Sequence, residues 1–444
     1  MTQPLSYLTA PADVHETLAK WMLVDGLPIV YDTAKSHGYT IIDARTGEAY
    51  LDLFSFFASM PIGHNHPGLA DEGFRQRLLA AALVKPSNSD IYTQAMADFV
   101  AAFGRTLPEP FVHTFFIEGG ALAVENALKV AFDWKVRKNI AAGRCVATPD
   151  PTLGTSVIHF ENAFHGRSGY TLSLTNGTSP AKTMYFPKFP WPRVPAPGCR
   201  FPVNLAAVEQ AEAESVAAIE AAFTKRPHDV AAIIVETIQG EGGDVHLRPE
   251  FLARLRTLCD RHEALLIFDE VQAGMGLTGH WWAFEGLGVT PDIFAFGKKT
   301  QVCGIAAGPR VDEVDSVFKV SSRINSTWGG NLADMVRCTR YIEIIEAEDL
   351  VGNAARVGKL FGEALTQLAA DNSVLSNVRG AGLMRAFDLP DTGTRDGLLK
   401  ALRRHKVLVL GAGSRSIRFR PVLDFDEAGV DLTIDRLRKA LGEL

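Results

Sequence analysis

The stretch ALLIFDEVQAGMGLTGHWWAFEGLGVTPDIFAFGKKTQ, residues 264–301, holds the pattern that decides the fold. It begins with an apolar run that stops at Asp269. Such a run is typical of a strand buried on both faces of a parallel sheet, although pattern alone does not separate it from a buried helix. A second apolar run, residues 293–296, is followed by Gly297 and Lys298. The sequence therefore predicts an acid and a lysine at two strand ends, where open α/β sheets bind ligands.

Asp269 and Lys298 together supply the chemistry that pyridoxal phosphate requires. A lysine amine holds this cofactor covalently, and a carboxylate keeps the pyridine nitrogen protonated so that the ring accepts electrons. Both residues also have ordinary interpretations. An Asp at a strand end is often a cap or surface group, and a pair such as Lys298-Lys299 is often solvated. These two features alone leave both interpretations open.

The composition excludes several other classes of protein. A chain of 444 residues suits two or three domains. Its 45 basic and 51 acidic residues give a net charge of −6, which indicates no nucleic-acid footprint. The five cysteines lack CxxC spacing, which favours reduced thiols over a metal site or a disulfide framework. Residues 1–16 lack the features of a signal peptide, and no apolar run approaches a membrane span. We therefore expect a cytoplasmic protein with no metal, membrane or nucleic-acid partner.

Strand and helix patterns alternate through the middle of the chain. The expected strands include residues 111–117, 156–160 and 231–235, and the expected helices include residues 203–223 and 252–262. This alternation predicts an α/β fold with a parallel sheet and right-handed crossovers. A helix over residues 11–23 and a hairpin over residues 39–53 precede it, and long helices over 333–346 and 349–370 follow it. From residue 373 short strands interleave with helices, as in a separate α+β domain.

A glycine-rich junction, Glu118-Gly119-Gly120-Ala121, separates the strand at 111–117 from a helix. This arrangement directs backbone N–H groups and the helix dipole toward a phosphate. A Gly-Gly turn alone is weak evidence for such a site.

The motifs in residues 264–301 resemble the signature of the class III (ω-amino acid) aminotransferases. The matching residues are Asp269-Glu270-Val271-Gln272, Gly274, Gly276, Trp282-Ala283, Glu285, Pro291-Asp292-Ile293 and Lys298. The resemblance covers essentially the whole chain and implies fold type I of the pyridoxal-phosphate-dependent transferases. It implies a large cofactor-binding domain over residues 69–332, with a mostly parallel sheet flanked by helices. Residues 333–444 then form a smaller α+β domain, which residues 1–68 join. It also implies a homodimer with active sites at the interface.

The resemblance also implies which residues hold pyridoxal phosphate. Lys298 and Asp269 carry the catalytic roles. The other cofactor contacts implied are Gly120 and Ala121 at the phosphate, Phe164 and Val271 on the two faces of the ring, Gln272 at the phenolic oxygen, and Thr327 at the phosphate in the partner subunit. Relatives usually have Asn-Ser-Gly where this chain has Glu118-Gly119-Gly120. A hydroxyl contact is therefore missing, and backbone amides must carry more of the binding.

For the substrate, the resemblance implies Arg167, Glu241, Gln272 and Arg420. Residues 299–304 depart from most relatives and are similar to the branch that moves the terminal amine of L-lysine to 2-oxoglutarate. Two arginines suit the two carboxylates of 2-oxoglutarate. A donor with one carboxylate needs only Arg167, so we expect Glu241 to neutralise the buried Arg420 in that state.

Two alternatives remain on the sequence alone. Ornithine or 4-aminobutyrate would use the same site residues, and one methylene discriminates only weakly between substrates. A non-catalytic, cofactor-binding regulatory protein of the same fold is the remote alternative.

Overall fold

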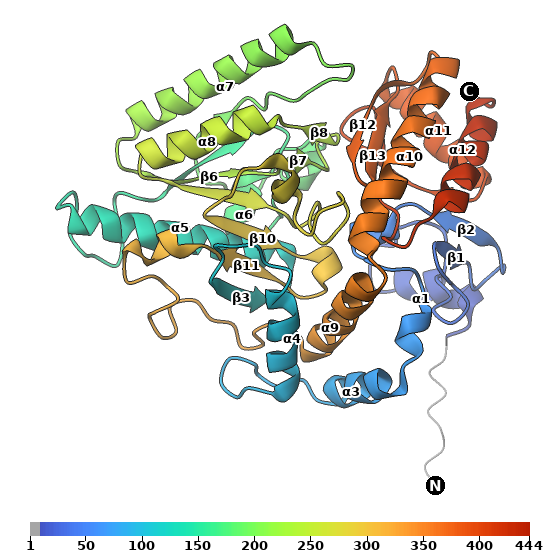
Figure 1. Ribbon diagram of the computed structural model, residues 1–444, viewed down its shortest axis with the longest axis horizontal. Helices are drawn as coiled ribbons and strands as arrows, with labels where there is room; N and C mark the ends of the chain where they lie inside the picture. The colour runs from blue at the N-terminus through green and yellow to red at the C-terminus, as the bar shows by residue number, and fades with distance from the viewer. Residues whose placement is uncertain (1–8) are drawn as a thin grey trace.

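The computed structural model describes residues 9–444, and the expectations for residues 1–8 fall outside this range. Its largest sheet has seven strands in the order β3-β11-β10-β9-β6-β4-β5 (Figure 1). These strands are His113–Ile117 (β3), Ser156–Phe160 (β4), Arg193–Val194 (β5), Val230–Val235 (β6), Leu265–Asp269 (β9), Ile293–Phe296 (β10) and Cys303–Ala307 (β11). The two apolar runs of the deciding stretch are therefore β9 and β10, and every residue in both strands is buried. They lie next to each other and run parallel.

Strand β11 departs from the parallel order, since it pairs antiparallel with both β10 and β3. No strand was expected there, because Gly304, Ala306 and Ala307 have weak strand propensity. Tertiary packing places it: a Cβ on Gly304 would lie 2.2 Å from the Phe115 carbonyl oxygen and 2.7 Å from the ring of Phe296. The sheet is mostly parallel, as expected.

Helices cover both faces of this sheet, which explains why its central strands are uniformly apolar. Leu265 and Ile267 pack in one cluster with the buried face of α5 (Gly120–Ala141). The alternate residues Leu266 and Phe268 pack in another cluster with α8 (Pro249–Arg261). The other helices of this part are α3 (Glu72–Leu83), α4 (Gln94–Gly104), α6 (Gly169–Leu174) and α7 (Leu205–Lys225).

The C-terminal part contains a four-stranded antiparallel sheet in the order β12-β13-β16-β15. Its strands are Ser376–Ala381 (β12), Met384–Asp388 (β13), Leu410–Ala412 (β15) and Ser416–Phe419 (β16), and its helices are α9 (Leu332–Ala347), α10 (Leu350–Asp371), α11 (Thr392–Arg404) and α12 (Glu427–Leu441). The N-terminal hairpin, Thr40–Ile42 (β1) and Ala49–Asp52 (β2), pairs with Val407–Leu408 (β14) of this part. The blue and red ends of the chain accordingly lie together in Figure 1.

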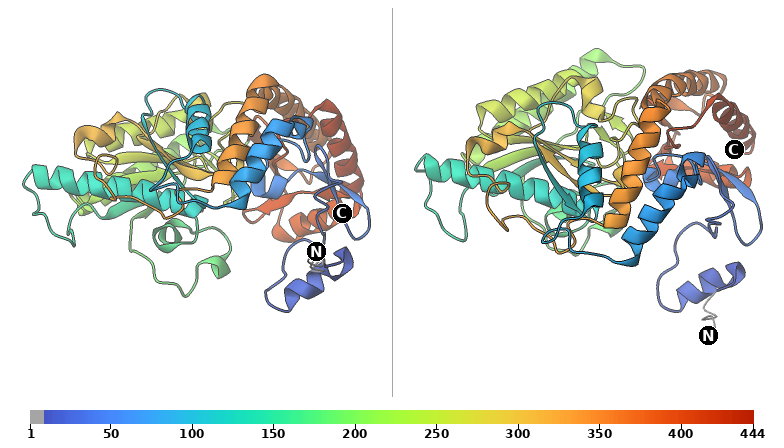
Figure 2. Two further views of the ribbon diagram at one scale, coloured as in Figure 1. Left: turned by 90° about the horizontal axis from the view of Figure 1, so that it is seen from below. Right: turned by 60° about the horizontal axis from the view of Figure 1, so that its bottom comes forward.

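The expected helix over residues 11–23 is shorter, since α1 spans only Val14–Ala19. It projects from the body of the molecule in both views of Figure 2. Residues 55–58 (α2, Ser55–Ala58) form a turn in which all four residues have positive φ. A two-stranded ribbon, Ile238–Gln239 (β7) and Val245–His246 (β8), lies at the edge of the large part. Within residues 9–444 no helix combines the length and hydropathy needed to cross a bilayer.

Candidate active site

Asp269 and Lys298 meet at one edge of the seven-stranded sheet. Asp269 ends β9, and Lys298 follows β10, the parallel neighbour in which Ala295 pairs with Asp269. A cavity of about 290 Å³ lies at this edge. The residues that line it are Gly120, Ala121, Phe164, His165, Gly166, Glu236, Asp269, Val271, Gln272 and Lys298. The cavity thus brings together seven residues expected to hold the cofactor.

The carboxylate of Asp269 is oriented by His165 and by its own loop. One oxygen, Oδ2, lies 2.8 Å from His165 Nδ1, and Oδ1 accepts the backbone N–H of Val271 at 3.0 Å. Burial alone would lower the pKa of His165, but the hydrogen bond and charge of Asp269, with the charge of Glu236, outweigh burial and raise that pKa. His165 and the Val271 N–H therefore fix the direction of the Asp269 carboxylate. The sequence analysis predicted no role for His165. The one feature that could have indicated a role is its position next to the predicted cofactor contact Phe164.

Glu236 is a second buried carboxylate in the cavity wall. It follows β6, and its oxygens accept the backbone N–H groups of Phe164 at 2.9 Å and Gly240 at 3.1 Å. Burial raises its pKa to about 7; the charge of Asp269 acts in the same direction, and His165 and these hydrogen bonds oppose the rise. Glu236 thereby holds the backbone of Phe164 in place.

Lys298 is the cavity lysine, and its amine is readily deprotonated. Burial, together with the positive charges of Arg418 and Arg420, lowers its pKa to about 8, and the charges of Asp269 and Glu236 oppose this shift. A neutral amine is the form that attacks a carbonyl carbon. The neighbouring Lys299 points elsewhere: it is buried and donates to the Gln272 carbonyl oxygen at 3.0 Å. Lys298-Lys299 is therefore not a solvated pair.

Small residues bring the N-terminus of α5 close to the cavity. Gly119, which precedes this 22-residue helix, has φ of +100°, and Gly120 and Ala121 open it. A Cβ on Gly120 would lie 2.9 Å from Val271 Cγ1, and a Cβ on Gly166 would lie 2.5 Å from the Cβ of Ala121. The first N–H groups of a helix have no intrahelical partner and attract anions. This end of the cavity is thus suited to a phosphate.

Arg420 has a different partner from the one expected. Its guanidinium forms two bonds to Asp244, at 2.8 and 2.5 Å, and both side chains are 1% exposed. Glu241 instead bonds Lys182 at 2.5 Å. The pairing of Glu241 with Arg420 that we expect with a one-carboxylate donor bound stays a prediction, and in this structure the two side chains do not pair. The reason is the turn between β7 and β8, in which the Asp244 N–H bonds the Gly240 carbonyl oxygen at 3.3 Å and Asp244 has φ of +52°.

Arg418 lies beside Arg420, and the sequence interpretation missed it. Arg418 lies in β16 and Arg420 directly follows that strand, with Phe419 between them, and both side chains reach Gln272. Both bond Gln272 Oε1: Arg418 Nη1 at 3.2 Å, and Arg420 Nε and Nη2 at 3.2 and 3.0 Å. Burial and the charge of Arg420 lower the pKa of Arg418 to about 10, and its Nε is buried without a partner. In the sequence, the pattern Arg418-Phe419-Arg420 at the end of an expected strand could have indicated that both arginines reach the same site.

Four expected site residues are not among those that line the cavity: Arg167, Glu241, Thr327 and Arg420. Of these, Arg167 and Thr327 are exposed, and within residues 9–444 neither forms an ion pair or a side-chain hydrogen bond. Arg167 directly follows Gly166, which lines the cavity. The roles of both residues remain predictions.

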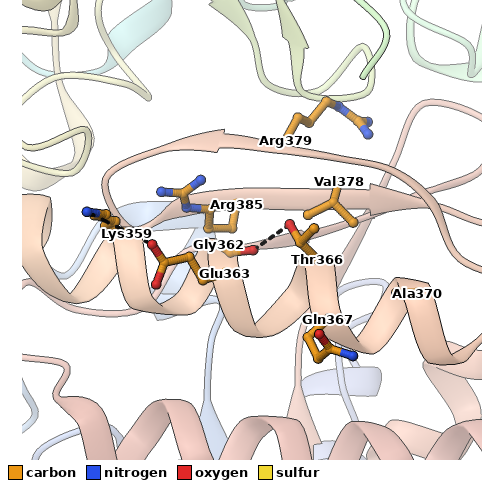
Figure 3. A pocket seen from close by; sticks show the side chains of 9 residues that line it. All are labelled: Lys359, Gly362, Glu363, Thr366, Gln367, Ala370, Val378, Arg379 and Arg385. Carbon is orange, nitrogen blue, oxygen red and sulfur yellow. Dashed lines mark hydrogen bonds and ion pairs between the residues drawn. The ribbon is translucent and has the colours of Figure 1, made fainter. Parts of the chain in front are cut away.

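A larger hollow of about 500 Å³ lies between α10 and the strands β12 and β13 (Figure 3). Its most buried cation, Arg379, donates to the carbonyl oxygens of Gly243, Asp244 and Asn377. Arg385 bonds the carbonyl oxygens of Gly382 and Gly380, and Thr366 bonds that of Gly362. Its one lining lysine, Lys359, pairs with Glu363 at 4.0 Å, and both side chains are exposed to solvent, at 79% and 61%. The smaller cavity at Lys298 is therefore the candidate active site.

Known proteins resemble this chain over nearly its full length. Residues 22–441 match the family described as Aminotransferase class-III. An L-lysine-epsilon aminotransferase of Mycobacterium tuberculosis is 56% identical over 98% of this chain and 96% of its own. A probable mitochondrial 4-aminobutyrate aminotransferase of Caenorhabditis elegans is 33% identical over 92% of this chain and 87% of its own. Among solved structures, lysine aminotransferase from M. tuberculosis in the internal aldimine form has a TM-score of 0.95 and 55% identity, covering 98% of this chain and 99% of that one.

Proposed function

The chain belongs to the class-III aminotransferases, and from this premise we propose that it moves the terminal amino group of L-lysine to 2-oxoglutarate. The products are 2-aminoadipate 6-semialdehyde and L-glutamate. The observation that carries the proposal is 56% identity to an L-lysine-epsilon aminotransferase over 98% of the chain. The cavity agrees with it, since Lys298 and Asp269 line it together with the N-terminus of α5, a position suited to an anion.

The cavity has the donor set that pyridoxal phosphate needs. Lys298 would hold the cofactor covalently, the N-terminus of α5 would hold its phosphate, and Asp269 would face its ring nitrogen. A Cβ on Gly120 would press into Val271 and narrow the cavity at the phosphate end, which explains the glycine there. When bound, the cofactor supplies an electron-accepting ring that stabilises negative charge on the substrate carbon next to the amine.

The chain's own residues then handle the proton. Lys298 Nζ, with its pKa near 8, is suited to accept a proton from the substrate carbon and return it to another atom. Asp269 holds negative charge at the far wall, and the His165 contact fixes the direction of its carboxylate. The backbone bond from Phe164 to Glu236 holds Phe164 in the cavity wall, where its side chain would face the cofactor ring.

Substrate carboxylates meet the cationic end of the cavity. Arg418 and Arg420 converge on the lining residue Gln272, and the exposed Arg167 directly follows the lining residue Gly166. Two cationic positions suit the two carboxylates of 2-oxoglutarate, and one suffices for L-lysine.

We further propose that the working form is a homodimer. Trp21 and Leu23, just after the projecting α1, are 92% and 79% exposed, and Ile91 and Tyr92 are 74% and 77% exposed. Exposed apolar groups of this size indicate a partner surface. Thr327 is also exposed, as a residue must be if it completes the partner subunit's phosphate site.

The test is a comparison of amino donors. Purified protein with pyridoxal phosphate and 2-oxoglutarate is assayed with L-lysine, ornithine and 4-aminobutyrate at equal concentration. We expect the highest kcat/KM with L-lysine. A faster reaction with ornithine or 4-aminobutyrate would replace the proposed donor, and cofactor binding without turnover of any donor would support the non-catalytic alternative.

A further inference from the structure

The backbone that carries Lys298 is strained at two places. Lys298 has φ of +56°, and Gln301 has φ of +58° and ψ of −49°, values that side chains rarely adopt. Gln301 is the middle residue of a γ-turn, in which the Val302 N–H donates to the Thr300 carbonyl oxygen at 2.5 Å. A γ-turn with positive φ is rare and strained. Strain of this kind persists only where the surrounding structure holds it, and it clusters at functional sites.

Gln301 holds the Lys298 backbone through its main chain and its side chain. The backbone N–H and the side-chain Nε2 of Gln301 both donate to the Lys298 carbonyl oxygen, at 2.9 and 3.1 Å. The same Nε2 donates to the Ser59 carbonyl oxygen at 2.9 Å, across 242 positions of sequence. The half-buried Gln301 side chain therefore ties the lysine segment to the N-terminal part of the chain.

The Ser59 carbonyl oxygen is a fixed point, because the turn before it is itself held. Residues 55–58 form a left-handed turn, and the Ser59 N–H donates to the Ser55 carbonyl oxygen at 2.8 Å. Asp52 Oδ1 accepts two backbone N–H groups at the start of this turn, at 3.0 and 2.8 Å, and Asp52 Oδ2 lies 2.9 Å from His64 Nε2. The side chains of Asp52 and His64 are both 0% exposed. These buried contacts offset the cost of a left-handed backbone in four successive residues that are not glycine.

We propose that Gln301 is a positioning residue for Lys298: by tying the lysine's carbonyl group to the turn at residues 55–58, it holds the backbone in the conformation that directs the amine into the cavity. The inference rests on the role of Lys298 in the proposed function, and it is independent of which amino donor the protein uses. Gln301 is not among the residues that line the cavity, so it acts on the cofactor through Lys298. A displacement of about 1 Å in a reacting group slows a reaction about 100-fold.

The rate at which Lys298 bonds to the cofactor reports the position of its amine. The amine adds to the aldehyde carbon of pyridoxal phosphate and a molecule of water leaves, so that a C=N bond forms and the absorbance changes. Stopped-flow mixing of the cofactor-free, full-length protein with saturating pyridoxal phosphate follows this reaction without any amino donor. Gln301→Met keeps the length of the side chain but removes both bonds of Nε2. We expect this variant to form the C=N bond about 10- to 100-fold more slowly than wild type.

Asn353→Leu is the matched control for a loss of stability alone. The half-buried Asn353 amide also donates to two backbone carbonyl oxygens, those of Leu423 and Phe425, at 2.7 and 2.9 Å. Asn353 does not line the cavity. Asn353→Leu should therefore lower the urea midpoint and leave the rate of C=N bond formation unchanged.

Two further variants separate backbone strain from position. Gln301→Gly relieves the strain at positive φ but has no side chain to reach Ser59, so it should react as slowly as Gln301→Met, with a urea midpoint no lower. At Phe57, whose side chain is 55% exposed, Phe57→Val opposes positive φ and should slow the reaction. Phe57→Gly adopts positive φ freely and should not slow it.

The outcomes distinguish this proposal from the proposed function. A wild-type rate in Gln301→Met, or equal slowing in Asn353→Leu, overturns the positioning role. Equal slowing in Phe57→Val and Phe57→Gly would show that the Phe57 ring acts rather than the turn, which also overturns it. If Lys298→Ala forms the C=N bond as wild type does, the role of Lys298 in the proposed function fails and the positioning role fails with it. A wild type that does not turn over L-lysine refutes the proposed function alone, because no amino donor takes part in this measurement.

Discussion

Replacing Asp244 with Asn tests which carboxylate neutralises Arg420. The change keeps the side chain's shape and part of its hydrogen bonding but removes its charge. Glu241→Gln is the matched control, because it makes the same chemical change at the carboxylate that the sequence assigned to Arg420. The structure predicts that Asp244→Asn destabilises the protein more than Glu241→Gln does. A pairing of Glu241 with Arg420 would predict the reverse order.

The magnitudes follow from burial. Asp244 and Arg420 are each 1% exposed, and removing one partner of such a pair costs on the order of 3–5 kcal/mol. Lys182, the partner of Glu241, is 38% exposed, and such pairs contribute about 1 kcal/mol or less. We therefore expect Asp244→Asn to lower the free energy of unfolding by about 3 kcal/mol and Glu241→Gln by about 1 kcal/mol or less.

Urea unfolding with and without glutarate measures both effects. In Asp244→Asn a carboxylate of glutarate can compensate Arg420, so glutarate should bind this variant more tightly than wild type and reduce the gap between their unfolding midpoints. A ligand at about 100 times its Kd adds about 2.7 kcal/mol of stability. If Glu241→Gln destabilises the protein as much as Asp244→Asn does, Glu241 is the partner of Arg420 in solution and our reasoning fails.

Three further predictions concern the cofactor end of the cavity. Between pH 8 and 10.5 Lys298 is protonated in the unfolded chain but neutral in the folded one. The free energy of unfolding of the cofactor-free protein should therefore rise with pH through this window. A urea midpoint that does not change between these pH values would contradict the lowered pKa of Lys298. Gly166→Ala should weaken cofactor binding about 10- to 100-fold, because Gly166 has a positive φ and the added Cβ would press on Ala121. The control is Gly143→Ala, at the far end of α5, where φ is also positive but no atom lies within 4 Å of the added Cβ. A fluorescence titration should show unchanged cofactor affinity for this control. Mixing inactive Lys298→Ala and Thr327→Ala subunits should restore some activity if Thr327 serves the partner subunit, and a monomer mass in solution would exclude this.

The sequence was most informative where local pattern and burial agree. Two uninterrupted apolar runs predicted β9 and β10, because a strand covered on both faces has no polar alternation to obscure it. Their ends placed Asp269 and Lys298, and parallel pairing brought both to one edge. The glycines before α5 likewise predicted a helix end at the cavity.

Side-chain partners could not be predicted in the same way. The pairing of Arg420 with Asp244 depends on how one turn folds back, and Glu241, only three residues earlier, is an equally good partner on sequence alone. His165 acquires its role only when β4 and β9 bring its ring to Asp269. Strand β11 forms because small residues pack under Phe296, against their own weak propensity.

The central claim is that Lys298 carries the cofactor. Borohydride reduction of the pyridoxal-phosphate-loaded protein makes the lysine–cofactor bond permanent, and peptide mass analysis then locates the modified residue. We expect the added mass on Lys298 alone, with none on the adjacent Lys299, whose amine is buried against the Gln272 carbonyl oxygen. Modification of Lys299, or of any lysine outside the cavity, would contradict the account.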